Sequence, residues 1–280
     1  MNSFNFSKVI KSALFVLGAQ LLILLISTIR SLILPSFFDI ESYGYWQLYL
    51  FYSAYVLIFA FGFNDGIYLR YGSKDYKELP FAKLRTSIRI FSLMSFFITL
   101  LVVYVSYLID FDPNTRFAMV FSGLNIFVLG LTGVFTYVFQ ITNQLKKYSF
   151  FSVADKILVL ITIGFMFIVN NTNFKLIIVV DFLAKLLVLT VMIYKCKELW
   201  LGENISISNA LKEFKANISV GVKLLIANLL GMLIIGLGRF MIQIFGSIED
   251  FATYSFGITI TGLILTAITS FSLVLYPILK

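Results

Sequence analysis

Long apolar runs alternate with short polar segments along almost the whole chain. Crossing the hydrocarbon core of a bilayer takes a helix of about 20 residues. Measured against that length, the sequence predicts about eight transmembrane helices, at Ala13–Leu34, Tyr43–Phe63, Ile88–Ile109, Phe117–Phe139, Phe150–Val169, Leu176–Tyr194, Val220–Ile242 and Phe251–Tyr276. We therefore expect an all-α fold, a polytopic transmembrane helical bundle.

Lysine and arginine indicate the orientation of these helices, because cytoplasmic loops carry an excess of both. They gather at the N-terminus and in every second loop, at Lys8, Lys11, Arg70, Lys74, Lys77, Lys83, Arg85, Arg89, Lys146, Lys147, Lys195, Lys197, Lys212, Lys215 and Lys280. The opposite loops contain Arg116 and Lys175 and are otherwise acidic. The N-terminus is therefore expected in the cytoplasm.

Composition supports a membrane protein. Apolar residues make up 60% of the chain and charged residues 13%, against about 45–50% and about 25% in soluble domains. The net charge of +8 does not predict nucleic-acid binding, because the basic residues lie in separate clusters between apolar runs. The chain has one cysteine and no histidine, which excludes an internal disulfide and removes the usual zinc ligand and the commonest general base. We expect no metal and no cofactor.

The longest predicted loop lies between the sixth and seventh helices. Its segment Ile205–Asn217 places Ile207, Leu211 and Phe214 on one helical face. Two interpretations stay open. The segment is an amphipathic helix on the cytoplasmic membrane surface, or it is a polar linker that begins the next helix.

A weak internal repeat, with an offset of about 209 residues, relates the first and seventh predicted helices. The matched pairs are Arg30 with Arg239, Glu41 with Asp250 and Tyr45 with Tyr254. Such a repeat predicts two six-helix lobes related by an axis along the membrane normal. Residues 1–203 would form the first lobe, and residues 204–280 the linker and first two helices of an incomplete second lobe.

Three short segments carry a resemblance to a known family: Ile40–Trp46, Gly62–Gly72 and Gly238–Ser255. Together they resemble polysaccharide and O-antigen (Wzx-type) flippases of the multidrug/oligosaccharidyl-lipid/polysaccharide exporter superfamily. Members of that family usually have more helices than are expected here, so the chain looks like an N-terminal fragment.

The resemblance implies a flippase that translocates an undecaprenyl-pyrophosphate-linked oligosaccharide across a bacterial or archaeal cytoplasmic membrane, for surface polysaccharide biosynthesis. It implies as partners the lipid-linked oligosaccharide, membrane lipids and glycan polymerase or assembly proteins. The sequence leaves two alternatives open: an ion-coupled small-molecule exporter of the multidrug type, and an intramembrane glycan-polymerising enzyme. The short external loops and the lack of paired carboxylates for acid–base chemistry argue against an enzyme.

A charged residue inside an apolar helix raises the free energy of insertion into a bilayer, so each one suggests a functional or structural role. Arg30 and Arg239 are candidates for a pair of guanidiniums that bind pyrophosphate in a central cavity. The alternative is that both side chains reach the outer headgroups. Lys223 would guide an anionic headgroup into the cavity or anchor its helix at the cytoplasmic surface.

Other polar residues have paired interpretations as well. Asp181 and Lys185 are four apart on one helix and can neutralise each other, or they couple transport to an ion. Asn64 and Asp65 would act at an inner gate, or simply end the second helix with Gly66 as its cap. Two amides in apolar runs would join helices or contact glycan hydroxyls: Gln20 and Asn228.

Overall fold

A computed structural model describes the backbone of residues 6–72 and 74–279 and the side chains of residues 15–72 and 74–265. Lys8, Lys11 and Lys280 lie outside the described side chains. The described backbone is helical and contains no strand, which confirms the all-α prediction. Its elements are α1 (Phe6–Phe37), α2 (Ile40–Tyr55), η1 (Val56–Ala60), α3 (Phe63–Tyr71), η2 (Tyr76–Glu78), α4 (Phe81–Leu108), α5 (Pro113–Ile141), α6 (Leu145–Ile168), α7 (Phe174–Lys195), η3 (Lys197–Leu199), α8 (Ile207–Phe245) and α9 (Ile248–Leu279).

Within the described residues, 6 helices are long and apolar enough to cross a membrane. The bent unit formed by α2, η1 and α3 brings the number to 7 if it is one span. The chain is therefore a multi-pass membrane protein. The eighth expected helix, Phe251–Tyr276, falls within α9, whose side chains beyond residue 265 lie outside the described part, so its span stays a prediction.

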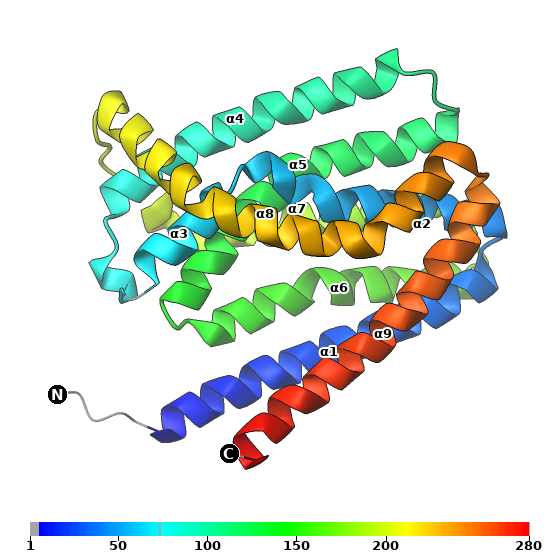
Figure 1. The fold of residues 1–280 in the computed structure, drawn as a ribbon, viewed down its shortest axis with the longest axis horizontal. Coiled ribbons are helices and arrows are strands. Elements are labelled where there is room, and N and C mark those ends of the chain that lie inside the picture. The colour runs from blue at the N-terminus through cyan, green and yellow to red at the C-terminus, as the bar shows by residue number, and fades with distance from the viewer. Residues whose placement is uncertain (1–5, 73, 280) are drawn as a thin grey trace.

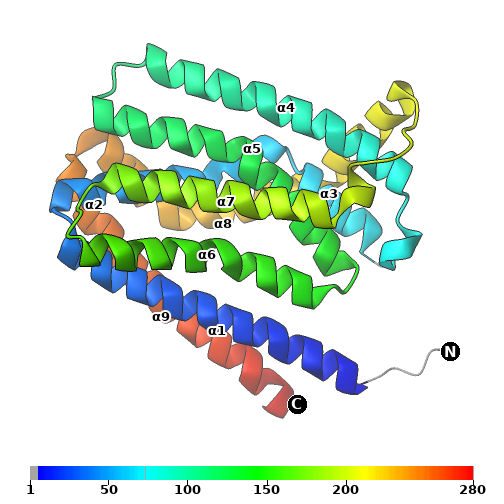
Figure 2. The ribbon, with the colours of Figure 1, turned by 180° about the vertical axis from the view of Figure 1, so that it is seen from behind.

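The helices run side by side, and their connections alternate between the two ends of the bundle (Figures 1 and 2). The start of α1 and the α3–α4, α5–α6 and α7–α8 connections lie at one end. The α1–α2, α4–α5, α6–α7 and α8–α9 turns lie at the other. The loops that are rich in lysine and arginine thus share one end, as the charge pattern requires.

The predicted second helix, Tyr43–Phe63, is broken. Helix α2 tightens into η1, and the chain then turns through Phe61 (φ 50°) and Gly62 (φ 80°) before α3 begins, bent by 61°. A left-handed φ is readily adopted by glycine and costs other residues energy. Asn64 and Asp65 therefore lie in the first turn of α3, and the expectation that Gly66 caps the end of a helix is wrong.

Helix α8 is continuous from Ile207, so the segment after the predicted linker is helical. It is part of α8 and not a separate surface helix. Between Ile207 and Asn217 the buried residues are Ala210, Glu213 and Asn217, whereas Ile207 is 74% and Leu211 41% exposed, so contact of that exposed apolar side with the membrane surface stays a prediction. Glu213 and Asn217 are buried because they contact α3. Arg70 donates to Glu213 Oε1 (2.5 Å) and to Asn217 Oδ1 (2.5 Å).

The hairpins α1–α2 and α8–α9 are built alike. Each has a two-residue turn, and each second helix is capped by an acidic side chain in or beside its first turn. Asp39 Oδ1 accepts from the Ser42 N–H (2.7 Å), and Asp250 Oδ2 accepts from the Ser247 N–H (3.0 Å). This likeness agrees with the weak repeat, and the two-lobe organisation stays a prediction.

Aromatic side chains form much of the core between α2, α3, α4 and α5. Phe63 stacks on Phe91, with ring centroids 4.6 Å apart. Trp46 and Tyr49 are also buried, and Tyr49 contacts Asn125 of α5 and Asp181 of α7. The segment that joins α7 to α8 is held against the start of α4, since Arg85 Nη2 donates to the carbonyl of Glu198 (2.7 Å).

The same segment holds the single cysteine in a protected position. Cys196 is 1% exposed, and burial raises the pKa of its thiol to about 11, from an ordinary value of about 8.5. Thiolate is the reactive form, so we expect no labelling by a polyethylene-glycol maleimide at pH 7 until the protein is denatured. A gel shift measures this, and equal labelling of folded and denatured protein would contradict it.

Candidate functional site

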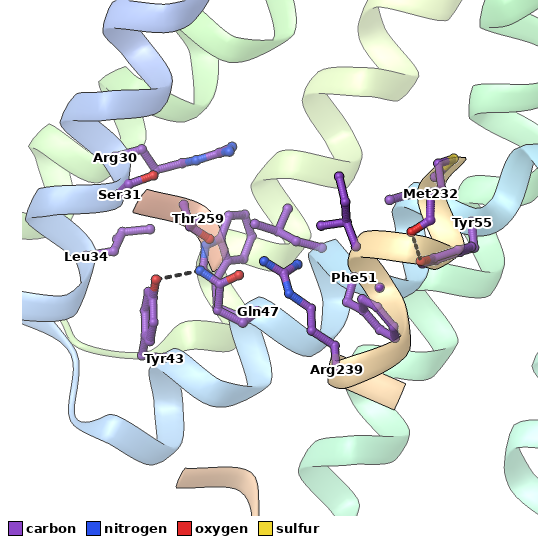
Figure 3. Close-up of a pocket in the computed structure, with 15 residues that line it drawn as sticks. Arg30, Ser31, Leu34, Tyr43, Gln47, Phe51, Tyr55, Met232, Arg239 and Thr259 are labelled. Atoms are coloured by element: carbon purple, nitrogen blue, oxygen red, sulfur yellow. Dashed lines mark hydrogen bonds between the residues drawn. The ribbon is translucent and has the colours of Figure 1, made fainter. Parts of the chain in front are cut away.

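Two arginines converge in a pocket between α1, α2, α8 and α9. The pocket has a volume of about 290 Å³. Arg30 enters it from α1 and Arg239 from α8, and Figure 3 shows both guanidinium groups directed toward its interior. The structure therefore brings together the two arginines that the repeat relates, although they are separated by most of the chain.

Both arginines lie well inside their helices. Arg30 is seven residues from the end of α1 and Arg239 six residues from the end of α8, which corresponds to about 10 Å at 1.5 Å per residue. The Arg30 guanidinium lies over the Trp46 ring, 5.8 Å from its centroid, and that of Arg239 lies over the Phe51 ring at 6.0 Å. Aromatic faces stabilise a cation in a partly desolvated position.

Neither arginine is neutralised by a carboxylate. No aspartate or glutamate lines the pocket, and the ion pairs of the described residues involve other cations. Arg239 Nη2 donates to the Ser255 carbonyl (3.3 Å), but its Nε is buried without a hydrogen-bond partner in the described structure. Two guanidiniums without a carboxylate partner, in a pocket with aromatic walls, are chemically suited to an anion.

The aromatic wall of the pocket is a feature that sequence reasoning missed. Tyr43, Trp46, Phe51 and Tyr55 of α2 all line it. The Tyr43 hydroxyl accepts from the amide of Gln47 (2.5 Å), and the Tyr55 hydroxyl donates to the Met232 carbonyl (3.0 Å). The pairs Tyr43–Trp46 and Phe51–Tyr55 have spacings of three and four residues, which put the two rings of each pair on one helical face, and those spacings are the signal in the sequence.

A second and larger pocket adjoins the first. Its volume is about 870 Å³, and it shares four lining residues with the arginine pocket: Ala54, Tyr55, Met232 and Ile235. Three of the predicted site residues line it, and they come from α3 and α8: Asn64, Asp65 and Asn228. Helix α8 thus forms a wall common to both pockets, and five of the predicted residues lie along one continuous interior surface.

Asp181 and Lys185 form a closed network elsewhere in the bundle. They are ion-paired, as their spacing on α7 predicted. The Tyr49 hydroxyl donates to Asp181 Oδ2 (2.5 Å) and accepts from the Asn125 amide (2.9 Å). This buried network fits the neutralising interpretation, and a role in ion coupling stays a prediction.

The two remaining predicted residues lie apart from the arginines. Lys223 is exposed on α8 and lines neither of the two adjoining pockets. Gln20 of α1 lines a separate pocket of about 220 Å³ together with Asp155, Lys156 and Lys185. Their predicted contacts with substrate in the arginine pocket have no support from this arrangement.

Known proteins offer no direct guide to these pockets. Comparisons with protein families, with curated proteins and with solved structures find no match to the chain. The interpretation of the site therefore depends on its own geometry and charge.

Proposed function

We propose that this protein is a flippase that moves an undecaprenyl-pyrophosphate-linked oligosaccharide across the cytoplasmic membrane. The observation that carries the proposal is the convergence of Arg30 and Arg239 in one pocket without a carboxylate. Guanidinium groups offer forked donors that match phosphate oxygens. A pyrophosphate supplies the negative charge that the pocket lacks.

The rest of the interior surface suits the remainder of such a substrate. Sugars have apolar ring faces and many hydroxyls, and the aromatic wall of α2 provides rings beside polar groups such as the Gln47 amide. The adjoining pocket extends the space available along α8. Because α1 and α2 belong to the predicted first lobe and α8 to the predicted second, relative movement of the lobes would open the site to either side in turn.

The two alternatives fit this pocket less well. An exporter of organic cations needs negative charge where its substrate binds, and the arginine pocket carries only positive charge. A glycan-polymerising enzyme needs a positioned acid or base, and no carboxylate lines this pocket.

Alanine at either arginine tests the proposal directly. We expect Arg30→Ala and Arg239→Ala each to weaken the binding of undecaprenyl pyrophosphate by about 10- to 100-fold, because a hydrogen bond to a charged group contributes about 1.5–3 kcal/mol. Lysine at either position should restore part of the affinity, since it keeps the charge but loses the fork. The measurement is native mass spectrometry of the purified chain titrated with the lipid.

Lys175→Ala is the matched control, because it removes one positive charge at the same end of the bundle and Lys175 does not line the pocket. Its affinity should equal that of the unaltered protein. Unchanged binding in both arginine variants would refute the proposal.

A further inference from the structure

Three carboxylates are buried in the described part of the bundle, and they differ in how their charge is balanced: Asp65, Asp181 and Glu213. Asp181 is paired with Lys185, and Glu213 with Arg70. Asp65 is 6% exposed and has no ion-pair partner among the described residues. One hydrogen bond, from the Tyr137 hydroxyl to Asp65 Oδ1 (3.2 Å), reaches it from another helix. An unbalanced buried carboxylate calls for a cation or a proton.

The side-chain amide of Asn64, the residue before Asp65, also has an oxygen without a hydrogen-bond partner in the described structure. Asn64 is 4% exposed, and its Nδ2 donates to the Gly130 carbonyl (3.0 Å). A carbonyl only accepts hydrogen bonds, so the nitrogen must face Gly130 and the oxygen must face away from it. That oxygen, Asn64 Oδ1, is buried without a partner in the described structure. Both Asn64 and Asp65 line the larger pocket.

Two threonines of α5 add acceptors to the lining of this pocket. Thr132 and Thr136 of α5 line the same pocket, and each donates its hydroxyl hydrogen to the carbonyl four residues earlier, at 2.7 and 2.8 Å. Their oxygens are therefore left with lone pairs and no hydrogen to offer. The lining of the pocket therefore contains several oxygen acceptors, which are the ligands of a hard cation.

The helix break favours an ionised Asp65. The residue lies in the first turn of α3, directly after the left-handed Gly62. The N-terminal end of a helix carries a partial positive charge that stabilises a carboxylate there. In broken membrane helices, cations are coordinated by unwound backbone carbonyls and by C-terminal helix ends, and η1 ends at Ala60, directly before this turn.

We infer that Asp65 and Asn64 bind a small monovalent cation of the size of Na⁺ at the break between η1 and α3. One carboxylate balances one positive charge, whereas a divalent ion would leave net charge in a medium of low dielectric constant. In the part of the chain that the structure describes, no group of three or more His, Cys, Asp or Glu gathers to hold a metal ion. The inference does not rest on the proposed function, since it concerns a different ligand and different side chains, although both use the larger pocket.

Radioactive ²²Na⁺ binding to the purified full chain in detergent tests it. The unaltered protein should bind ²²Na⁺ saturably, and Asp65→Asn should abolish the binding while keeping an acceptor for Tyr137. Asn64→Leu keeps the charge but loses the amide oxygen, so its affinity should fall about tenfold or more. Thermal unfolding without Na⁺ checks that both variants fold.

Two further variants make the result specific. Asp110→Asn removes a carboxylate in the exposed α4–α5 loop and should leave ²²Na⁺ binding unchanged. Lys175→Ala should also leave it unchanged, because Lys175 lines neither pocket. Because the probe is Na⁺ without lipid, a failure of the pyrophosphate proposal would not be confused with a failure here. Absence of saturable ²²Na⁺ binding to the unaltered protein, or wild-type binding by folded Asp65→Asn, would overturn the inference; the first result would point to a protonated carboxyl group.

Discussion

Replacing Lys185 with methionine is expected to lower the free energy of unfolding by about 3–5 kcal/mol, because it leaves a buried carboxylate without its cation. Asp181 is 4% exposed and lies between α7 and α2, where Tyr49 donates to it. No other basic side chain of the described residues pairs with it. The measurement is unfolding of the purified protein in detergent by a denaturant.

The double variant separates charge balance from packing. Asp181→Asn together with Lys185→Met removes both charges, and the new amide oxygen still accepts from Tyr49. Replacing a complete buried pair by neutral residues is often nearly neutral for stability, so the double variant should recover most of the lost free energy. A coupling energy near zero in this double-mutant cycle would show that the ion pair does not carry the effect.

Local spacing made this pair predictable, and the same holds for much of the fold. Asp181 and Lys185 lie four residues apart, so a helix alone brings them together. Long apolar runs likewise predicted where most of the helices end to within a few residues, but α1, α4 and α8 begin 7, 7 and 13 residues before the predicted starts. Arg70 and Glu213 show the limit, because they are separated by 143 positions and nothing in either segment marks the other as its partner.

The candidate sites divide in the same way. The repeat drew attention to Arg30 and Arg239 because it placed them at matching depths in two helices, and the structure puts them in one pocket. Asn64 and Asp65 were noticed as polar residues at the end of the second predicted helix. Their place after a helix break could not be predicted by hydropathy, because the average over a window does not register a change of backbone direction at Gly62.

That break is tied to a close crossing of α3 and α8, which the second large prediction concerns. A Cβ atom added at Gly221 would lie 1.9 Å from the Gly62 carbonyl oxygen, and one added at Gly66 would lie 1.9 Å from that of Asn217. Both neighbours are backbone atoms, which cannot rotate away as a side chain can. Gly62 and Gly66 are four apart, the spacing of small residues that lets membrane helices approach, and this signal in the sequence could have predicted the contact.

Gly221→Ala is therefore expected to destabilise the protein by about 3 kcal/mol, the upper part of the range for overpacking, and Gly66→Ala by a similar amount. Gly164→Ala is the control, since a Cβ there meets nothing within 4 Å and alanine favours a helix over glycine by up to about 1 kcal/mol. Denaturant unfolding in detergent should show opposite signs for the two kinds of variant. Because α3 and α8 belong to different predicted lobes, equal stability of all three variants would mean that this crossing does not hold the lobes together. Other contacts between them, such as Arg70 with Glu213 and Tyr55 with the Met232 carbonyl, would then do so.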